Sequence, residues 1–233
     1  MYLRLREQIL CIMEIRLVTT NDDSHSLYVP ALDEHYHSIH GAVTESLHVF
    51  INEGFLRIKK SHVRIFEVGF GTGLNALLTF LTAGEHHIRV DYHTIDIQPL
   101  PLPILQQINY PEVLHMETRD LYMRLHEVPW NEPVRFSEYF TLHKFLEDIT
   151  LHQWNERYDL CYFDAFGPDK QPAMWDRSIF NAIYSTLVPG GMLVTYSAKG
   201  TFRRTLAEIG FTVEKRPGPG IKRHMTAAIK EHA

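Results

Sequence analysis

The apolar run Val63–Val68 and the glycines directly after it constrain the fold more than any other part of the chain. Gly69, Gly71 and Gly73 follow this β-branched run, and a helical pattern extends from Leu74 to Thr82. Glycines allow the backbone to turn sharply from a strand into a helix, and they let a ligand approach the helix N-terminus closely. We therefore expect a strand–turn–helix unit that binds a nucleoside-containing ligand.

The spacing of these glycines separates two classes of ligand. A dinucleotide-binding turn would need a glycine at position 74, where the chain has Leu74. The segment Glu67–Gly73 instead reads E-x-G-x-G-x-G, which resembles motif I of S-adenosylmethionine-dependent methyltransferases. The ammonium group of that cofactor suits an acidic partner such as Glu67. The alternative is a glycine turn that binds nothing. The predicted cofactor-binding residues here are Glu67, Gly69, Phe70, Gly71, Gly73 and Asn75.

From His62 onward, apolar runs alternate with helical segments, a pattern that predicts a parallel sheet wrapped by helices. Predicted strands are Val63–Val68, Val90–Ile95, Val134–Phe140, Tyr158–Phe163, Met192–Tyr196, Phe211–Lys215 and Met225–Ile229. Predicted helices are Leu74–Thr82, Leu102–Ile108, His143–Ile149, Phe180–Leu187 and Phe202–Ile209. The fold class is α/β, as in class I methyltransferases: a Rossmann-like, mostly parallel sheet of seven strands with helices on both faces. We expect residues 62–233 to form this domain and residues 1–61 to form an N-terminal extension or lid.

Two residues at predicted strand ends are candidates for binding the cofactor's nucleoside. Asp96 lies 23 residues after Gly73, near the separation at which an acid accepts hydrogen bonds from ribose hydroxyls. Thr141 follows the third predicted strand, where many methyltransferases have an acid that binds the adenine amino group. Asp96 could also be a simple surface acid.

The fourth predicted strand leads into Asp164-Ala165-Phe166-Gly167-Pro168, where the methyl acceptor should bind. An aliphatic amine, with a pKa of about 10 by analogy with lysine, is mostly protonated at neutral pH. A carboxylate can orient such an amine and accept its proton. We expect Asp164 to do this, with Phe166 packed on the acceptor. The alternative role for Asp164 is that of a helix cap.

Composition indicates a folded protein of the cytoplasm. The two cysteines, Cys11 and Cys161, are too few for a disulfide framework. Glu7 and Gln8 interrupt the only apolar N-terminal run, so we expect no signal peptide, and we regard Met13 as an equally good start. No stretch approaches the roughly 18 consecutive apolar residues of a membrane span.

Charge is distributed unevenly along the chain. The net charge is −5, yet residues 199–223 hold seven cations against two acids, a local balance of +5. The cations are Lys199, Arg203, Arg204, Lys215, Arg216, Lys222 and Arg223. Such a cluster can bind phosphates or can be an ordinary solvated surface.

The histidines at positions 35, 37 and 40 do not predict a metal site. No cysteine accompanies them, and their spacing does not place them on one helix face. We expect His35, His37 and His40 to belong to a lid over the cofactor and expect no metal.

Several motifs together resemble the MnmC-like family, which makes 5-methylaminomethyl-2-thiouridine at the wobble position of tRNA. The matching segments are Gly69–Asn75, Asp96, Asp164–Pro168, Met174-Trp175, Phe180–Ala182, Pro189–Gly191, Arg203-Arg204, Gly210-Phe211 and Lys222–Met225. The resemblance implies methyl transfer from S-adenosylmethionine to an aminomethyl nitrogen on tRNA. It also implies that the basic cluster holds the anticodon stem-loop. A wobble base turned out of its stack would need an aromatic pocket, for which Phe70, Phe166, Trp175 and Tyr196 are the candidates by strand position; each of them could equally belong to the core.

The chain departs from the two-domain members of that family. Those members carry an FAD-dependent oxidase domain, which we do not expect here, and they have an acid where this chain has Thr141. Three other functions remain open: aminopropyl transfer, as in spermidine synthases, methylation of a small-molecule amine, and tRNA binding without turnover. Further acids near Asp164 would favour aminopropyl transfer, whereas a basic surface favours tRNA. The oligomeric state is open, and a monomer is compatible with the sequence.

Overall fold

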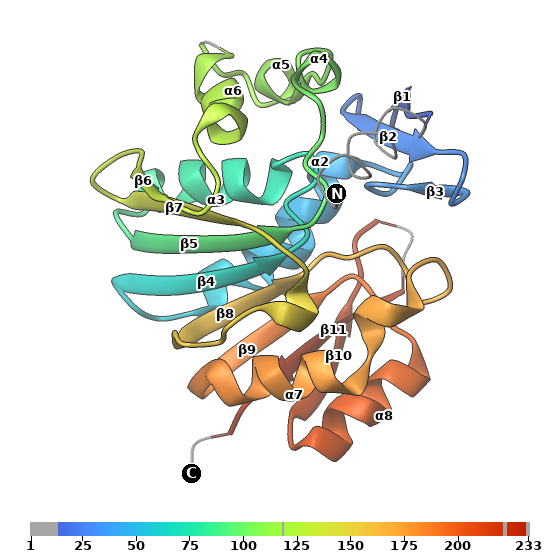
Figure 1. The fold of residues 1–233 in the computed structure, drawn as a ribbon, viewed down its shortest axis with the longest axis vertical. Helices are drawn as coiled ribbons and strands as arrows, with labels where there is room; N and C mark the ends of the chain where they lie inside the picture. Colours follow the sequence, from blue (N-terminus) through green and yellow to red (C-terminus); the bar gives the residue numbers. More distant parts are fainter. Residues whose placement is uncertain (1–13, 118, 221–222, 232–233) are drawn as a thin grey trace, which may run out of the picture.

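The computed structural model describes residues 14–117, 119–220 and 223–231, and is drawn in Figure 1. Cys11, the alternative start at Met13, and Lys222 lie outside these ranges. The large sheet contains β4 (His62–Val68), β5 (Arg89–Asp96), β6 (Pro133–Arg135), β7 (Phe140–Leu146), β8 (Tyr158–Phe163), β9 (Leu187–Thr195), β10 (Thr212–Pro217) and β11 (His224–Ile229). A small sheet contains β1 (Arg16–Thr19), β2 (His25–Val29) and β3 (Glu34–His35).

The large sheet has the strand order β10-β11-β9-β8-β4-β5-β7-β6. Strands β4, β5, β7, β8 and β9 are parallel, and β11 runs antiparallel between β9 and β10. This is the predicted parallel sheet closed by an antiparallel last strand, with the short β6 added at one edge. The chain leaves β4 toward β5 and returns to its other side at β8, so the two halves of the sheet diverge beside β4. Ligands in open α/β sheets bind at such a switch point, beyond the carboxyl ends of the strands.

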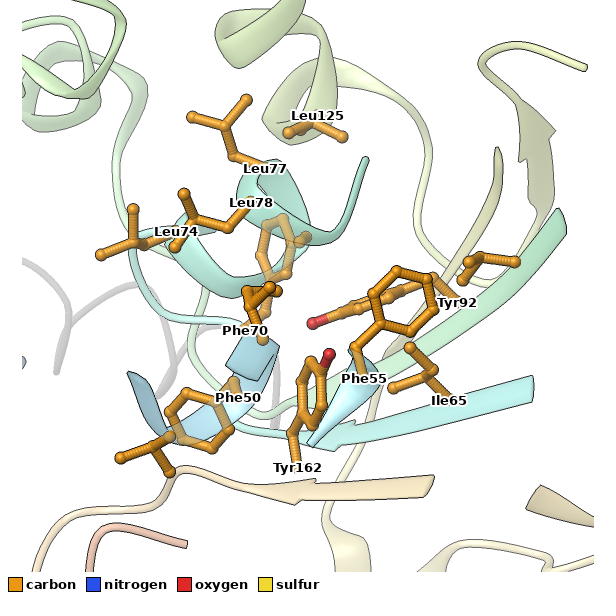
Figure 2. Close-up of a cluster of buried hydrophobic side chains, with 14 of the residues drawn as sticks. Phe50, Phe55, Ile65, Phe70, Leu74, Leu77, Leu78, Tyr92, Leu125 and Tyr162 are labelled. Carbon is orange, nitrogen blue, oxygen red and sulfur yellow. The ribbon is translucent and has the colours of Figure 1, made fainter. Parts of the chain in front are cut away.

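Helices cover both faces of the large sheet. They are α2 (Ala42–Ser46), α3 (Leu74–Glu85), α4 (Leu102–Leu105), α5 (Tyr110–Val113), α6 (Asp120–Glu127), α7 (Arg177–Thr186) and α8 (Gly200–Ile209). Shorter turns are η1 (Leu47–Asn52), η2 (Phe55–Arg57), η3 (Ile149–Leu151) and η4 (Pro172–Trp175). In Figure 1, α3 to α6 lie on one side of the sheet, and α7 and α8 lie on the other. Each face has its own buried cluster, and Figure 2 shows the one beneath α3.

The third predicted strand was placed wrongly. The predicted strand Val134–Phe140 is a hairpin of β6 and β7, and the predicted helix His143–Ile149 falls mainly in β7. Residues of β7 alternate between buried and half-buried, as in a strand with one enclosed face. Lys144 occupies one of the buried positions, where its Nζ donates to the carbonyls of Leu125 (2.9 Å) and His126 (2.7 Å) at the end of α6. Because the inward-facing position 144 holds a charged lysine, the two-residue alternation of apolar and polar side chains that marks a strand is interrupted in the sequence.

Two connections also differ from prediction. The helix predicted over Leu102–Ile108 ends at Leu105, and the chain continues into α5 and α6, which the sequence did not predict. The segment Pro189–Gly191, which separates the predicted helix Phe180–Leu187 from the predicted strand Met192–Tyr196, lies inside β9, where the pairing with β8 is irregular. In contrast, α3, α7 and α8 all include the core of their predicted helices.

The N-terminal segment packs beside the same sheet. Buried residues of α2 and η1, among them Val49 and Phe50, belong to the cluster that also contains Ile65 and Leu77. The small sheet lies beyond the carboxyl ends of the large-sheet strands, close to where the ligand is expected (Figure 1). Within the described residues, no helix is long and apolar enough to cross a membrane.

Candidate active site

A cavity of about 730 Å³ opens at the carboxyl ends of β4, β5, β7 and β8. This volume lies in the usual range for small-molecule and cofactor sites. The N-terminal segment forms one wall, which includes Glu34, Tyr36 and His37. The cavity is therefore bounded by the switch point of the sheet and by a segment far away in sequence.

The glycine turn forms the floor of this cavity. Gly69, Gly71 and Gly73 have φ values of 91°, 48° and 69°, which favour glycine. A Cβ on Gly69 would lie 2.8 Å from the carbonyl oxygen of Asp164, so the two loops could not pack as they do. Gly69 and Gly71 line the cavity, whereas Gly73 precedes α3 and lies against the His126 ring. The turn therefore brings the backbone of Gly69 and Gly71 to the surface of the cavity.

Thr72, inside the glycine turn, is fixed by three separate elements. Tyr122 of α6 donates a hydrogen bond to its carbonyl oxygen (3.0 Å), and Tyr110 of α5 donates to its hydroxyl (3.2 Å). His37 Nε2 lies 2.7 Å from the same hydroxyl. These contacts connect the turn to the N-terminal segment and make it rigid.

Asp96 lies at the end of β5 and lines the cavity. Its Oδ2 accepts a hydrogen bond from the Gly71 amide (3.0 Å), and its Oδ1 accepts one from the Gln98 amide (2.8 Å). Burial raises the pKa of this carboxyl group, while the backbone hydrogen bonds oppose the rise. A carboxylate oriented in this way at the end of β5 suits hydrogen bonds from ribose hydroxyls.

Glu67 occupies a different place from the one predicted. It is fully buried, and it lies beneath the turn rather than in the cavity wall. Burial raises the pKa of its carboxyl group to about 8, and the charge of Asp164 adds to the rise. Direct contact with the cofactor ammonium, which the sequence suggested, does not fit this enclosed position.

Asp164 follows β8 and lines the cavity opposite Asp96. Its amide donates to the Val68 carbonyl (3.1 Å), and its Oδ2 accepts a hydrogen bond from Asn75 Nδ2 (2.8 Å). Asn75, predicted as a cofactor residue, thus holds the predicted catalytic acid and also lines the cavity. One carboxylate oxygen is oriented by the protein at the switch point of the sheet.

Aromatic side chains surround the outer part of the cavity. Phe166 and Tyr36 meet edge to face with ring centroids 5.0 Å apart, and both line the cavity. Tyr196 lines it too and donates a hydrogen bond to the Ala165 carbonyl (2.8 Å). Phe70 lines the cavity but is almost fully buried. Trp175 packs between Phe163 and Phe202 and does not line the cavity, so it is a structural residue.

The prediction for Thr141 was wrong, because β7 begins at Phe140 rather than ending there. Thr141 pairs with Asp91 near the start of the strands, and it does not line the cavity. Two acids follow the end of the third parallel strand and line the cavity: Glu147 and, beside Ile149, Asp148. Asp148 Oδ1 accepts hydrogen bonds from the Thr150 amide (2.9 Å) and hydroxyl (2.7 Å). The alternation along Phe140–Leu146 is the signal that would have located it.

His35, His37 and His40 all line the cavity, as expected for a segment that covers it. Across residues 14–117, 119–220 and 223–231, no three histidine, cysteine or acidic side chains are grouped so that they could hold a metal ion.

The basic residues do not all lie together. Arg203, Lys215 and Arg223 surround His224, whose pKa is lowered by burial and then by these three charges. Lys199 and Arg223 line a second cavity of about 440 Å³. It shares Glu34, Gly167, Lys170 and Tyr196 with the main cavity.

Two of the basic residues have acidic partners. Lys199 pairs with Asp169. Arg216 differs most from the prediction, because it pairs with Glu53 (3.2 Å) and Glu214 (2.7 Å) and its side chain is only 17% exposed. Arg204 is exposed on α8.

Comparison with known proteins agrees with this geometry. A family model described as S-adenosyl-L-methionine-dependent methyltransferase matches residues 114–231, half of the chain. The tRNA 5-methylaminomethyl-2-thiouridine biosynthesis bifunctional protein MnmC of Leptospira borgpetersenii serovar Hardjo-bovis (strain JB197) is 32% identical over 83% of the chain. The protein of the same name from Maricaulis maris is 32% identical over 73% of it. The chain spans about a third of the length of these relatives, 32% and 30%.

Solved structures are similar as well. MNMC2 from Aquifex aeolicus has a TM-score of 0.72 and 26% identity, over 97% of this chain and 76% of that one. Spermidine synthase from Thermotoga maritima shares the fold, with a TM-score of 0.59 and 10% identity over 94% of this chain and 69% of that one. The chain therefore belongs to the S-adenosyl-L-methionine-dependent methyltransferases, and its resemblance to the MnmC-like family is confirmed.

Proposed function

We propose that this protein is a cytoplasmic enzyme that methylates the amine of 5-aminomethyl-2-thiouridine at the tRNA wobble position, giving 5-methylaminomethyl-2-thiouridine. The observation that carries the proposal is Asp164, held by Asn75 at the mouth of a nucleoside-sized cavity. The MnmC relatives, named for the biosynthesis of this nucleoside, support the choice of acceptor.

The cavity fits S-adenosylmethionine, which supplies a methyl group bound to a positively charged sulfur. Asp96 would accept hydrogen bonds from the ribose, and Asp148 and Ile149 would lie beside the adenine. The backbone of Gly69, Phe70 and Gly71 would pack against the nucleoside. Because Glu67 is enclosed, the acids available to the cofactor are those that line the cavity.

Asp164 would orient the acceptor amine and receive its proton. The amine nitrogen would take the methyl group from the sulfonium as the bond from that carbon to sulfur breaks, and the amine proton would leave through the Asp164 carboxylate to solvent. Asn75 holds Oδ2 of Asp164, so the carboxyl group meets the amine in one orientation. Phe166 and Tyr36 would pack on the uracil ring of an acceptor turned out of its stack.

The cationic surface beside the cavity would bind the anticodon stem-loop. Lys199 and Arg223 line the second cavity, and Arg203 and Lys215 lie around His224 next to it. Lys and Arg side chains bind nucleic-acid phosphates largely through charge. A polyanion following this surface would enter the main cavity at Gly167 and Tyr196.

The test is to incubate the protein with isotope-labelled S-adenosylmethionine and tRNA bearing 5-aminomethyl-2-thiouridine, followed by nucleoside mass analysis. We expect one labelled methyl group on the wobble nucleoside. The matched control is the same tRNA without the aminomethyl group, which should stay unlabelled. Failure to label the aminomethyl tRNA would contradict the proposed substrate.

One observation favours aminopropyl transfer as a second candidate. Burial raises the pKa of the Tyr196 hydroxyl, and the negative charges of three nearby acids, Asp164, Glu34 and Glu45, raise it further. Several acids around one cavity would suit a polyamine. Formation of spermidine from putrescine and decarboxylated S-adenosylmethionine would identify this activity. The cations Lys199 and Arg223 beside the cavity favour the tRNA substrate instead.

A further inference from the structure

A cluster of buried polar atoms lies beneath the glycine turn. Among the described residues, seven buried side-chain nitrogen or oxygen atoms lack a hydrogen-bond partner, and five of them belong to this cluster. They are both carboxyl oxygens of Glu67, Oδ1 of Asn75, the hydroxyl of Tyr92 and the hydroxyl of Thr94. Buried polar atoms in native proteins almost always have partners, so such a concentration needs an explanation.

Glu67 is at the centre of this cluster. It pairs in register with Thr94 of β5 and Tyr162 of β8, and it is 0% exposed. Thr94, Asn75 and Tyr92 lie around its carboxyl group and oppose the rise in its pKa, but none of them forms a hydrogen bond of normal geometry with it. In Figure 2, the hydroxyl ends of Tyr92 and Tyr162 point toward each other beneath α3.

Asn75 connects this cluster to the active site. Its Nδ2 donates to Asp164 Oδ2 at 2.8 Å, so its Oδ1 faces away from Asp164 and needs a donor. An ionised Glu67 has no proton to give, because a carboxylate only accepts hydrogen bonds. A protonated Glu67 carries the O–H donor that the amide oxygen lacks.

We propose that Glu67 remains protonated in the active enzyme and acts through Asn75 as a positioning residue for Asp164. Its proton fixes the Asn75 amide so that the NH₂ group points to Asp164. This role rests on the proposed function only in that Asp164 is the group that meets the acceptor.

Electrostatics supports the neutral form of Glu67. Burial is the main cause that raises the pKa of this carboxyl group to about 8, and the nearby charge of Asp164 raises it further. The other titratable groups around it are Tyr92, Tyr162 and the thiol of Cys161, whose pKa values are all raised by burial. They stay neutral when Glu67 ionises.

Loss of the Glu67 proton should break the hydrogen-bonded path that runs from Glu67 through Asn75 to Asp164. Above a pH of about 8, the charged carboxylate repels Asn75 Oδ1 and attracts its NH₂ group. The amide then rotates, and Asp164 loses its donor. Turnover should fall with this ionisation even though Glu67 never touches the substrate.

The first test needs no substrate, so its result does not depend on which amine is methylated. Infrared spectra of the wild-type protein, with and without ¹³C-carboxyl glutamate, should show a glutamic acid carbonyl band at neutral pH. The band should shift with the label and disappear with a midpoint at a pH of about 8. It should be missing in Glu67→Gln. No label-sensitive band in the wild type at neutral pH would overturn the proposal.

The second test compares two variants in methyl transfer. Glu67→Gln keeps an NH₂ donor for Asn75 and cannot ionise, so kcat should stay within about threefold of wild type at neutral pH. Its ratio to wild type should then rise by about tenfold per pH unit above the midpoint. Glu67→Ala should lose at least about tenfold in kcat, with KM for S-adenosylmethionine nearly unchanged. A ratio that stays flat across the midpoint would show that Glu67 does not position Asp164, even if tRNA is methylated.

Discussion

Individual residues in this protein are positioned by partners from distant parts of the chain. Asp164 is held by Asn75 of α3, and Asp96 is held by the amides of Gly71 and Gln98. Each carboxylate therefore meets a ligand in a fixed orientation, which lowers the entropy lost when the ligand is bound for reaction. These two acids could be singled out from the sequence because each stands at the carboxyl end of a predicted strand: Asp96 is the last residue of β5, and Asp164 directly follows β8.

Asp164→Asn tests the proton-accepting role at this scale. The amide keeps the shape of the carboxylate and can still accept a hydrogen bond from Asn75, but it is a far weaker base. We expect kcat to fall by about 100-fold or more, the usual contribution of general base catalysis. The dissociation constant of S-adenosylmethionine, measured by calorimetry, should change little. The matched control is Glu156→Gln, at an exposed acid before β8 that lines neither cavity, and it should keep wild-type turnover. Full activity in Asp164→Asn would remove the role.

At the scale of elements, strands whose buried positions hold mostly apolar residues were predicted correctly, whereas the strand with a lysine at a buried position was not. Strands β4 and β8 are buried along most of their length, and the predicted bounds agree with the observed ones to within one residue. Strand β7 was misplaced because Lys144 points inward, where carbonyls of α6 bind its ammonium group. Because of that error, the strand was predicted to end too early, and Asp148 was not recognised as a residue that follows a strand end. The contacts of Tyr36 and His37 with the glycine turn join distant segments and leave no local signal.

The surface formed by α8, β10 and the start of β11 is expected to bind tRNA through its cations, and this can be tested by substitution. Arg203→Ala with Lys215→Ala should weaken tRNA binding and reduce the slope of log affinity against log salt by about 1.5, because two phosphate contacts are lost. Filter binding across a salt series measures this slope. Lys59→Ala with Arg89→Ala removes two exposed cations near the amino ends of β4 and β5, and it should leave the slope unchanged. Equal slopes in both double variants would exclude this surface.

At the scale of the whole molecule, the N-terminal segment and the sheet form one site. The sheet contributes Asp96 and Asp164 at the switch point, and the N-terminal segment contributes Tyr36 and His37 to the same cavity. The cationic surface adjoins this cavity through Gly167 and Tyr196. Under the proposed function, the cofactor would bind at β4 and β5 and the acceptor would bind at β8 and β9.

The most direct test of this account is a crystal structure of the protein with S-adenosylhomocysteine. We expect the ribose hydroxyls to lie within about 3 Å of the Asp96 carboxylate oxygens, with the adenine beside Asp148 and Ile149 and the sulfur facing Asp164. A nucleoside bound outside this cavity, or a ribose that does not contact Asp96, would contradict it.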